Sequence, residues 1–238
     1  MNGSIQVQTN FIPSFKIGYT PTVNQIQQSV QYFPYSSSFC DPNAETINDS
    51  NTYTLNFPIH LPDPTQPSVQ YKPVGGGPIS YQLSNSALFA AADATGQDPI
   101  SKECVNSFGT HVPSDGICHG HSIDPCLIDY TTKPLLTGWY MDGYPCISPF
   151  VIQVDEQPTH FPYVEKDGKY YRMIQSSDLD RNNGLSGQFT VDISIQGVVQ
   201  TLSYPYAYIC TNDRPYTLSA YVGSIKLINQ NIQQFQNH

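Results

Sequence analysis

Residues 189–204, FTVDISIQGVVQTLSY, contain the pattern that decides the fold. Apolar and polar residues alternate from Phe189 to Ile195, which is typical of a strand with one buried face. Gln196-Gly197 then marks a turn, and the next residues form a second run rich in β-branched and aromatic side chains. This stretch therefore predicts a long β-hairpin.

Two other stretches show the same kind of pattern. Residues 53–60, YTLNFPIH, alternate apolar and polar positions and end before Pro62, which predicts a half-buried strand. Asp167-Gly168 lies between Val164 and the apolar-rich residues 170–174, and this dipeptide is a strong hairpin signal. Strands and tight turns therefore recur along the chain.

The two ends differ from the centre. Residues 1–22 scatter apolar residues among Gln, Asn and Thr, and we expect an extended arm that forms an edge strand or adds to a neighbouring sheet. Three consecutive alanines in residues 86–92 favour a short helical turn. A C-terminal helix is predicted behind a Ser224 cap by apolar residues spaced close to 3.6 apart. These residues are Ile225, Ile228, Ile232 and Phe235.

Composition agrees with a β-rich fold. Only 12% of the 238 residues are charged, about half of what is usual, whereas 20 Pro, 16 Gly and 17 Tyr leave little room for long helices. No segment repeats at a fixed period. We expect one mainly β domain, sandwich-like and disulfide-bonded, with an arm over 1–22, a β-rich body over 23–214 and a C-terminal strand and helix tail over 215–238.

The charge balance limits the possible partners. Ten Lys and Arg oppose nineteen Asp and Glu, and the net charge of -9 disfavours nucleic acids and anionic membranes as ligands. No run approaches about 18 consecutive apolar residues, so no membrane span is expected. The first residues have neither a basic region nor an apolar one, so we expect no signal peptide in this numbering.

The cysteines and two glycosylation sequons favour an extracellular location. The cysteine number is even and no Cys-x-x-Cys pair occurs, so disulfides are the expected use, with a cytosolic thiol protein as the alternative. The sequence alone leaves the connectivity open. Asn2 and Asn48 begin sequons that fit a secreted glycoprotein whose leader is absent from this numbering. The six cysteines are Cys40, Cys104, Cys118, Cys126, Cys146 and Cys210.

Three histidines lie close together in the sequence. His119 and His121 are two residues apart, so on a strand both rings leave the same face, about 7 Å apart at their Cα atoms. A three-residue loop over 114–116 places His111 opposite His119, with all three rings on one face. A two-residue loop places His111 opposite Gly120 instead, with its ring on the other face.

Three neutral imidazoles with an open position match a zinc, copper or iron site. Asp142 is a candidate general base beside these histidines, since a carboxylate can orient an imidazole. Asp-Gly before an aromatic residue is also an ordinary turn. The alternative for the histidines is pairing with carboxylates or backbone groups in a tyrosine-rich core.

The motifs around these residues resemble the YHYH domain family. The likeness covers about residues 75–211, with residue 45 as its upstream limit. Both tyrosines of the family motif are replaced in this chain, by Cys118 and Gly120. The resemblance implies an extracellular β-rich domain and a pairing of Cys104 with Cys126, which leaves Cys118 with Cys146 and Cys40 with Cys210. It implies no reaction. The matching motifs are residues 76–79, 89–96, 109–111, 118–121, 125–127, 136–149, 179–184 and 204–210.

Three functions are consistent with the sequence. The first is a non-enzymatic extracellular structural or adhesive subunit that self-associates through the N-terminal arm and the C-terminal helix into a filament or surface layer. The second is a metal-binding protein or metal-dependent enzyme that uses His111, His119 and His121. The third is recognition of a glycan or cell-surface partner through Trp139 and exposed tyrosines.

Overall fold

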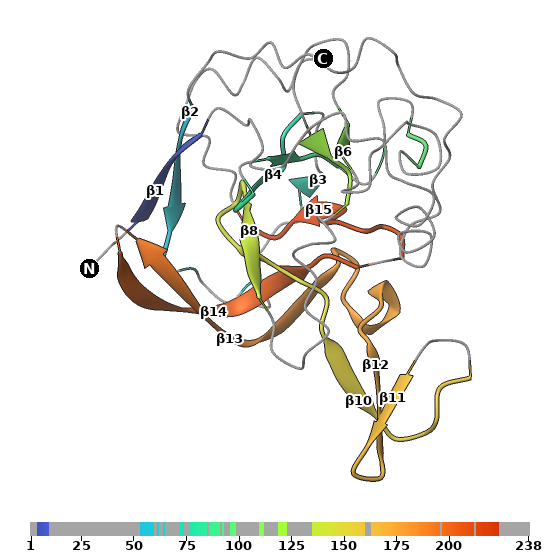
Figure 1. Cartoon of the computed structure of the whole chain (residues 1–238). Coiled ribbons are helices and arrows are strands. Elements are labelled where there is room, and N and C mark those ends of the chain that lie inside the picture. Colours follow the sequence, from blue (N-terminus) through green and yellow to red (C-terminus); the bar gives the residue numbers. More distant parts are fainter. Residues whose placement is uncertain are drawn as a thin grey trace, which may run out of the picture.

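The computed structural model of the chain (Figure 1) describes residues 4–9, 53–59, 61, 64, 72–73, 77–84, 86–90, 92, 96–98, 110–111, 119–122, 135–159, 163–195, 197–211 and 213–223. The fold is mainly β and contains several sheets, as the sequence predicts. The predicted C-terminal helix, both sequon asparagines and four cysteines (Cys40, Cys104, Cys118 and Cys126) lie outside these residues.

The strands are β1 Ser4–Thr9, β2 Tyr53–Pro58, β3 Lys72–Pro73, β4 Ser80–Gln82, β5 Ala87–Leu88, β6 Thr110–His111, β7 His119–Gly120, β8 Leu136–Tyr140, β9 Pro145–Ile147, β10 Val151–Val154, β11 Tyr163–Lys166, β12 Lys169–Met173, β13 Gly184–Ile195, β14 Val198–Ile209 and β15 Ala220–Tyr221. A 3-10 turn, η3, covers Ser176–Asp178.

An eight-stranded sheet forms the centre of the molecule. Its order is β13-β14-β9-β8-β4-β5-β7-β6, so strands far apart in the sequence lie side by side. Two strand pairs in this sheet, β14–β9 and β5–β7, are parallel, and the other five pairs are antiparallel. This sheet carries most of the buried hydrophobic residues that the structure describes, with Tyr140, Ala207 and Ile209 fully buried.

The hairpin predicted from residues 189–204 is confirmed as β13 and β14. Ile195 lies opposite Val198 across the predicted turn, and the strands extend beyond the prediction to Gly184 and Ile209. The alternation predicted for β13 holds, because Phe189 and Val191 are buried while Thr190 and Asp192 are exposed. The hairpin is the longest element and runs along the lower left of the molecule (Figure 1).

β1 and β2 form a second layer over the central sheet. They pair antiparallel, so the start of the arm is a strand that adds to its own chain, and the strand predicted at 53–60 is present as β2. Ile5 and Phe57 point into the core. Phe57 stacks on Trp139 of β8, with ring centroids 5.4 Å apart, and on Tyr81 of β4 at 6.5 Å. The two layers thus enclose an aromatic core.

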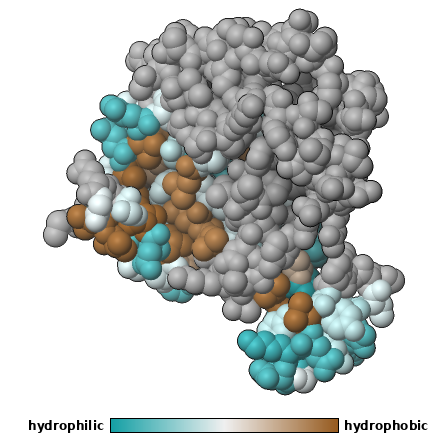
Figure 2. Space-filling model, in the orientation of Figure 1, coloured by the Kyte–Doolittle hydropathy of each residue, from teal (hydrophilic) through white to brown (hydrophobic). Residues whose placement is uncertain are grey.

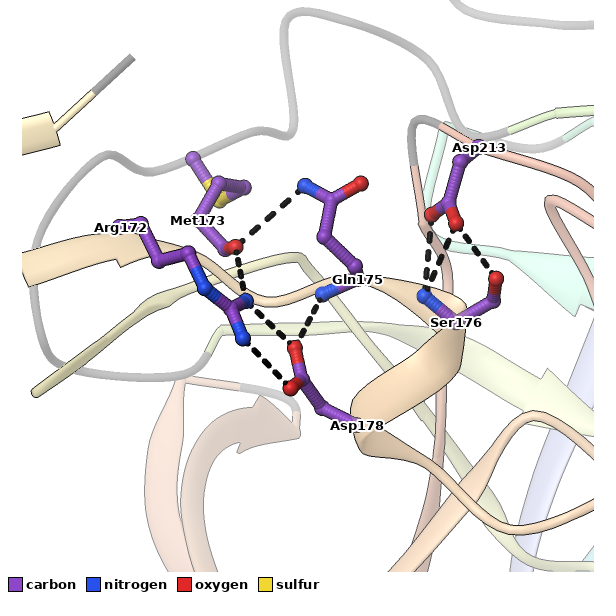
Figure 3. A network of polar contacts seen from close by, with 6 residues as sticks. All are labelled: Arg172, Met173, Gln175, Ser176, Asp178 and Asp213. Atoms are coloured by element: carbon purple, nitrogen blue, oxygen red, sulfur yellow. Dashed lines mark hydrogen bonds and ion pairs between the residues drawn. The ribbon is translucent and has the colours of Figure 1, made fainter. Parts of the chain in front are cut away.

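A small sheet of order β10-β12-β11 protrudes at the lower right of Figure 1. Its hairpin turns at Asp167-Gly168, as predicted, and both residues have the positive φ angles of a tight two-residue turn. Arg172 binds Asp178 of η3 through two hydrogen bonds of 2.6 and 2.7 Å (Figure 3). At the start of η3, the amide and the hydroxyl of Ser176 both donate hydrogen bonds to the Asp213 carboxylate (Figure 3). These contacts attach the small sheet to the segment after β14.

The helical turn predicted over residues 86–92 is wrong for the part that the structure describes. Ala87 and Leu88 form β5, with Ala87 opposite Tyr81 on one side and His119 on the other. Both residues are buried between neighbouring strands, and this packing outweighs the helix propensity of alanine. Within the described residues, no helix has the length and apolar character that crossing a membrane requires.

Candidate functional site

The histidine segment forms the end of the eight-stranded sheet. β7 pairs in parallel with β5, and β6 is the last strand of the sheet. His111 lies opposite His119 and Thr110 opposite Gly120. This register is the one predicted for a three-residue loop, and it contradicts the two-residue alternative.

The rings of His119 and His121 are buried and lie edge to face, with centroids 5.0 Å apart. Phe89 stacks flat on His119 at 3.6 Å. Nδ1 of His121 lies 2.8 Å from the carbonyl oxygen of Ala90. Because a carbonyl oxygen only accepts, Nδ1 donates, and Nε2 carries the lone pair in the neutral ring. This arrangement orients His121 either as a metal ligand or as a core residue.

The predicted metal site is therefore only partly visible. His119 and His121 come together, whereas the side chain of His111 lies outside the described structure. Among the described side chains, no group of three or more His, Cys, Asp or Glu is arranged to hold a metal ion. The three-histidine site stays a prediction.

Asp142 lies in the turn after β8 and is buried. Its Oδ2 atom accepts hydrogen bonds from the Tyr208 hydroxyl at 2.7 Å and from the Gly223 amide at 3.0 Å. The Tyr144 amide donates to Oδ1 at 3.4 Å. None of these partners is a histidine, so these contacts give Asp142 the role of an acceptor that joins β8, β14 and the segment after β15.

Burial raises the pKa of Asp142 from 3.8 to about 6, and the hydrogen bonds from Tyr208, Gly223 and Tyr144 oppose this rise only in part. Burial and the nearby Asp142 carboxylate also raise the pKa of Tyr208 and that of Tyr221. The cluster therefore carries a titratable carboxyl group at mildly acidic pH.

A layer of buried polar side chains lies on one face of the central strands, and it includes two cysteines. Gln82 donates to the Ser80 hydroxyl at 2.7 Å, and the Tyr140 hydroxyl lies 3.6 Å from Sγ of Cys210. The Sγ atoms of Cys146 and Cys210 are 2.9 Å apart with no disulfide between them in this structure, and both residues are fully buried. This contact differs from the implied pairings of Cys146 with Cys118 and Cys210 with Cys40.

Comparison of the chain with models of protein families, with curated proteins and with solved structures finds no match. The likeness to the YHYH domain family accordingly stays a prediction from the motifs.

Two surface features were not predicted from the sequence. A groove of about 620 Å³ separates the β1 layer from β13 and the start of β8. Beside it, β13 is the outermost of the described strands in the eight-stranded sheet. The apolar alternation of β13 was visible in the sequence, but its position at the sheet edge depends on pairings between distant segments. The groove is lined by residues 5–8, Tyr81, Leu83, Leu135, Leu136, Trp139 and residues 192–194.

Proposed function

We propose that this chain is an extracellular structural or adhesive subunit, and that copies associate through the exposed edge of β13 and the tip of the β13–β14 hairpin. The observation that carries the proposal is the position of β13. Its twelve residues lie at the end of the central sheet, and among the described strands only β14 pairs with it. An unpaired strand edge is a template for a strand from another chain.

The sequence of β13 favours such pairing. Residues 189–195, FTVDISI, contain no proline and no glycine, and Asp192 is the only charged residue. Thr201 Oγ1 on β14 donates a hydrogen bond of 2.6 Å to the Asp192 carboxylate, which holds this charged side chain beside β14. Charges, prolines and bulges normally protect edge strands, and the β13 bulge lies between Ser186 and Phe189, away from the turn.

The tip of the hairpin adds apolar surface. Val198 and Val199, the first residues of β14, are 61% and 68% exposed. Figure 2 shows hydrophobic surface on the left of the molecule, on the side where Figure 1 places β1 and the hairpin turn. The groove between β1 and β13 lies next to this surface. A second copy that pairs with β13 would cover both the strand edge and these valines.

A paired substitution tests this proposal. Val198→Lys with Val199→Lys places two charges at the interface, and we expect the dissociation constant for self-association to rise at least tenfold, by analogy with charged edge strands. Val164→Lys is the matched control, because Val164 is 62% exposed on β11 of the small sheet. Sedimentation velocity over a range of concentrations measures the association. A wild-type chain that stays monomeric, or equal weakening by Val164→Lys, contradicts the proposal.

A metal-binding function is the second candidate, and it is favoured by the register of β6 and β7. His111 lies opposite His119, and the hydrogen bond to Ala90 fixes the tautomer of His121. If these three residues bind zinc or copper, the protein retains about one equivalent after dialysis.

The substitutions His119→Ala and His121→Ala are each expected to abolish this binding, and His160→Ala is the control for loss of one histidine elsewhere. Elemental analysis after dialysis reports the bound metal. Retention of metal by the His121→Ala variant, or no metal on the wild-type protein, excludes the site.

A further inference from the structure

We infer that Cys146 and Cys210 form a disulfide bond that locks β9 to β14. The two sulfur atoms lie 2.9 Å apart. This separation is shorter than the roughly 3.5–4.0 Å at which non-bonded heavy atoms pack best, and about 0.9 Å longer than a sulfur–sulfur bond. The sulfur atoms therefore need to approach by only about 0.9 Å to form the bond.

The sheet register explains why the two side chains meet. Cys146 lies opposite Tyr208 in the parallel joint of β9 and β14, and Ile147 lies opposite Ile209. Cys210 follows two residues after Tyr208, and its amide donates to the Ile147 carbonyl at 3.1 Å. Because side chains two residues apart leave a strand on the same face, Cys210 points to the side occupied by Cys146.

The surroundings favour formation of the bond during folding. Both cysteines are fully buried, so an oxidant reaches them before the sheet closes. Burial raises the pKa of the Cys146 thiol, but hydrogen bonds from Cys210, Thr137, Tyr140 and Gln82 outweigh burial and lower that pKa overall. The hydrogen bond to Cys146, together with burial, raises the pKa of Cys210.

The oxidant is a small disulfide of the glutathione class. The thiolate of one cysteine attacks one sulfur of that disulfide, forms a mixed disulfide and releases one thiol. The thiolate of the other cysteine then attacks the cysteine sulfur of the mixed disulfide and releases the second thiol. The two cysteines lose two protons and two electrons in total, and the small disulfide gains them.

The bond has a mechanical consequence. The described joint between the long hairpin and the rest of the sheet is short, because β14 pairs with only two residues of β9. A covalent link at this joint carries load from the hairpin into the core. The disulfide does not depend on self-association, so a failure of one proposal leaves the other standing.

Peptide mapping tests the disulfide directly. Wild-type protein secreted from eukaryotic cells is denatured, treated with iodoacetamide without reduction and digested with a protease that cleaves before Asp. Cleavage before Asp142, Asp155, Asp192 and Asp213 yields peptides 142–154 and 192–212, each with a single cysteine. We expect these two peptides to be linked and to separate on reduction. Two carbamidomethylated peptides before reduction, or a link from either to another cysteine, overturns the inference.

A second measurement uses stability. The bond closes a loop between positions 64 residues apart, so its reduction is expected to lower the Tm by about 10 °C. The Cys146→Ser and Cys210→Ser variants, each analysed with and without reductant, serve as controls because neither variant can form this disulfide. A reductant effect of equal size in the wild type and both variants contradicts the assignment.

Discussion

Gly138→Ala is expected to lower the free energy of unfolding by about 4 kcal/mol or more, which is at the upper end of single-substitution effects. Gly138 lies in β8, between β4 and β9. A Cβ atom on it would lie 2.0 Å from the Tyr81 carbonyl oxygen and 2.9 Å from the Gln82 Cα atom. Both are backbone atoms held in the ladder, so relief requires the strands to separate.

Gly168→Ala is the control for this substitution. Gly168 lies in the turn between β11 and β12, has a φ of 70° and has open space where its Cβ would be. The left-handed conformation alone costs alanine about 1 kcal/mol. Urea unfolding followed by the fluorescence of Trp139, the single tryptophan, measures both variants. Equal stability of Gly138→Ala and wild type would show that β4 and β8 do not pair in this register.

Asp142→Asn is expected to remove a strong pH dependence of stability. The folded pKa of Asp142 is about 6 against an ordinary value of 3.8, so the folded chain binds the proton more tightly than the unfolded chain. The resulting stabilisation is fully present below about pH 4, falls as the pH rises towards 6 and is absent above it. The difference between the two pKa values corresponds to about 3 kcal/mol.

Asparagine suits the test because its amide oxygen can accept the hydrogen bonds that Tyr208 and Gly223 donate to Oδ2. We expect the wild type to lose about 3 kcal/mol relative to Asp142→Asn between pH 4 and pH 7, measured by urea unfolding at each pH. Asp192→Asn, which alters an exposed carboxylate, is the control for a charge change. A constant difference between wild type and Asp142→Asn across this range contradicts a buried, titrating Asp142.

Features that depend on neighbouring residues were predictable from the sequence. The hairpins at Asp167-Gly168 and Gln196-Gly197 follow from alternation and turn residues, and the structure confirms both. For His111 the sequence left two registers open, and the structure has the one in which His111 lies opposite His119. Such patterns act over a few residues, where the backbone leaves few alternatives.

Features that depend on distant segments were not predictable. The β9–β14 joint brings Cys146 to Cys210 across 64 positions, and no local signal marks these two cysteines as neighbours. A helical turn was predicted over residues 86–92 from their alanines, but pairing on both sides makes Ala87 part of a strand. Asp142 lies in the turn that its Asp-Gly dipeptide indicates, whereas its tyrosine partner comes from β14.

Hydrogen–deuterium exchange at two protein concentrations tests whether copies of the chain associate through the β13 edge. Peptides covering residues 184–195 report β13, and peptides covering residues 163–173 report the small sheet as an internal reference. We expect exchange in β13 to slow as the protein is concentrated, while exchange in the small sheet stays the same. Identical β13 exchange at both concentrations, in samples whose sedimentation shows association, would place the interface elsewhere.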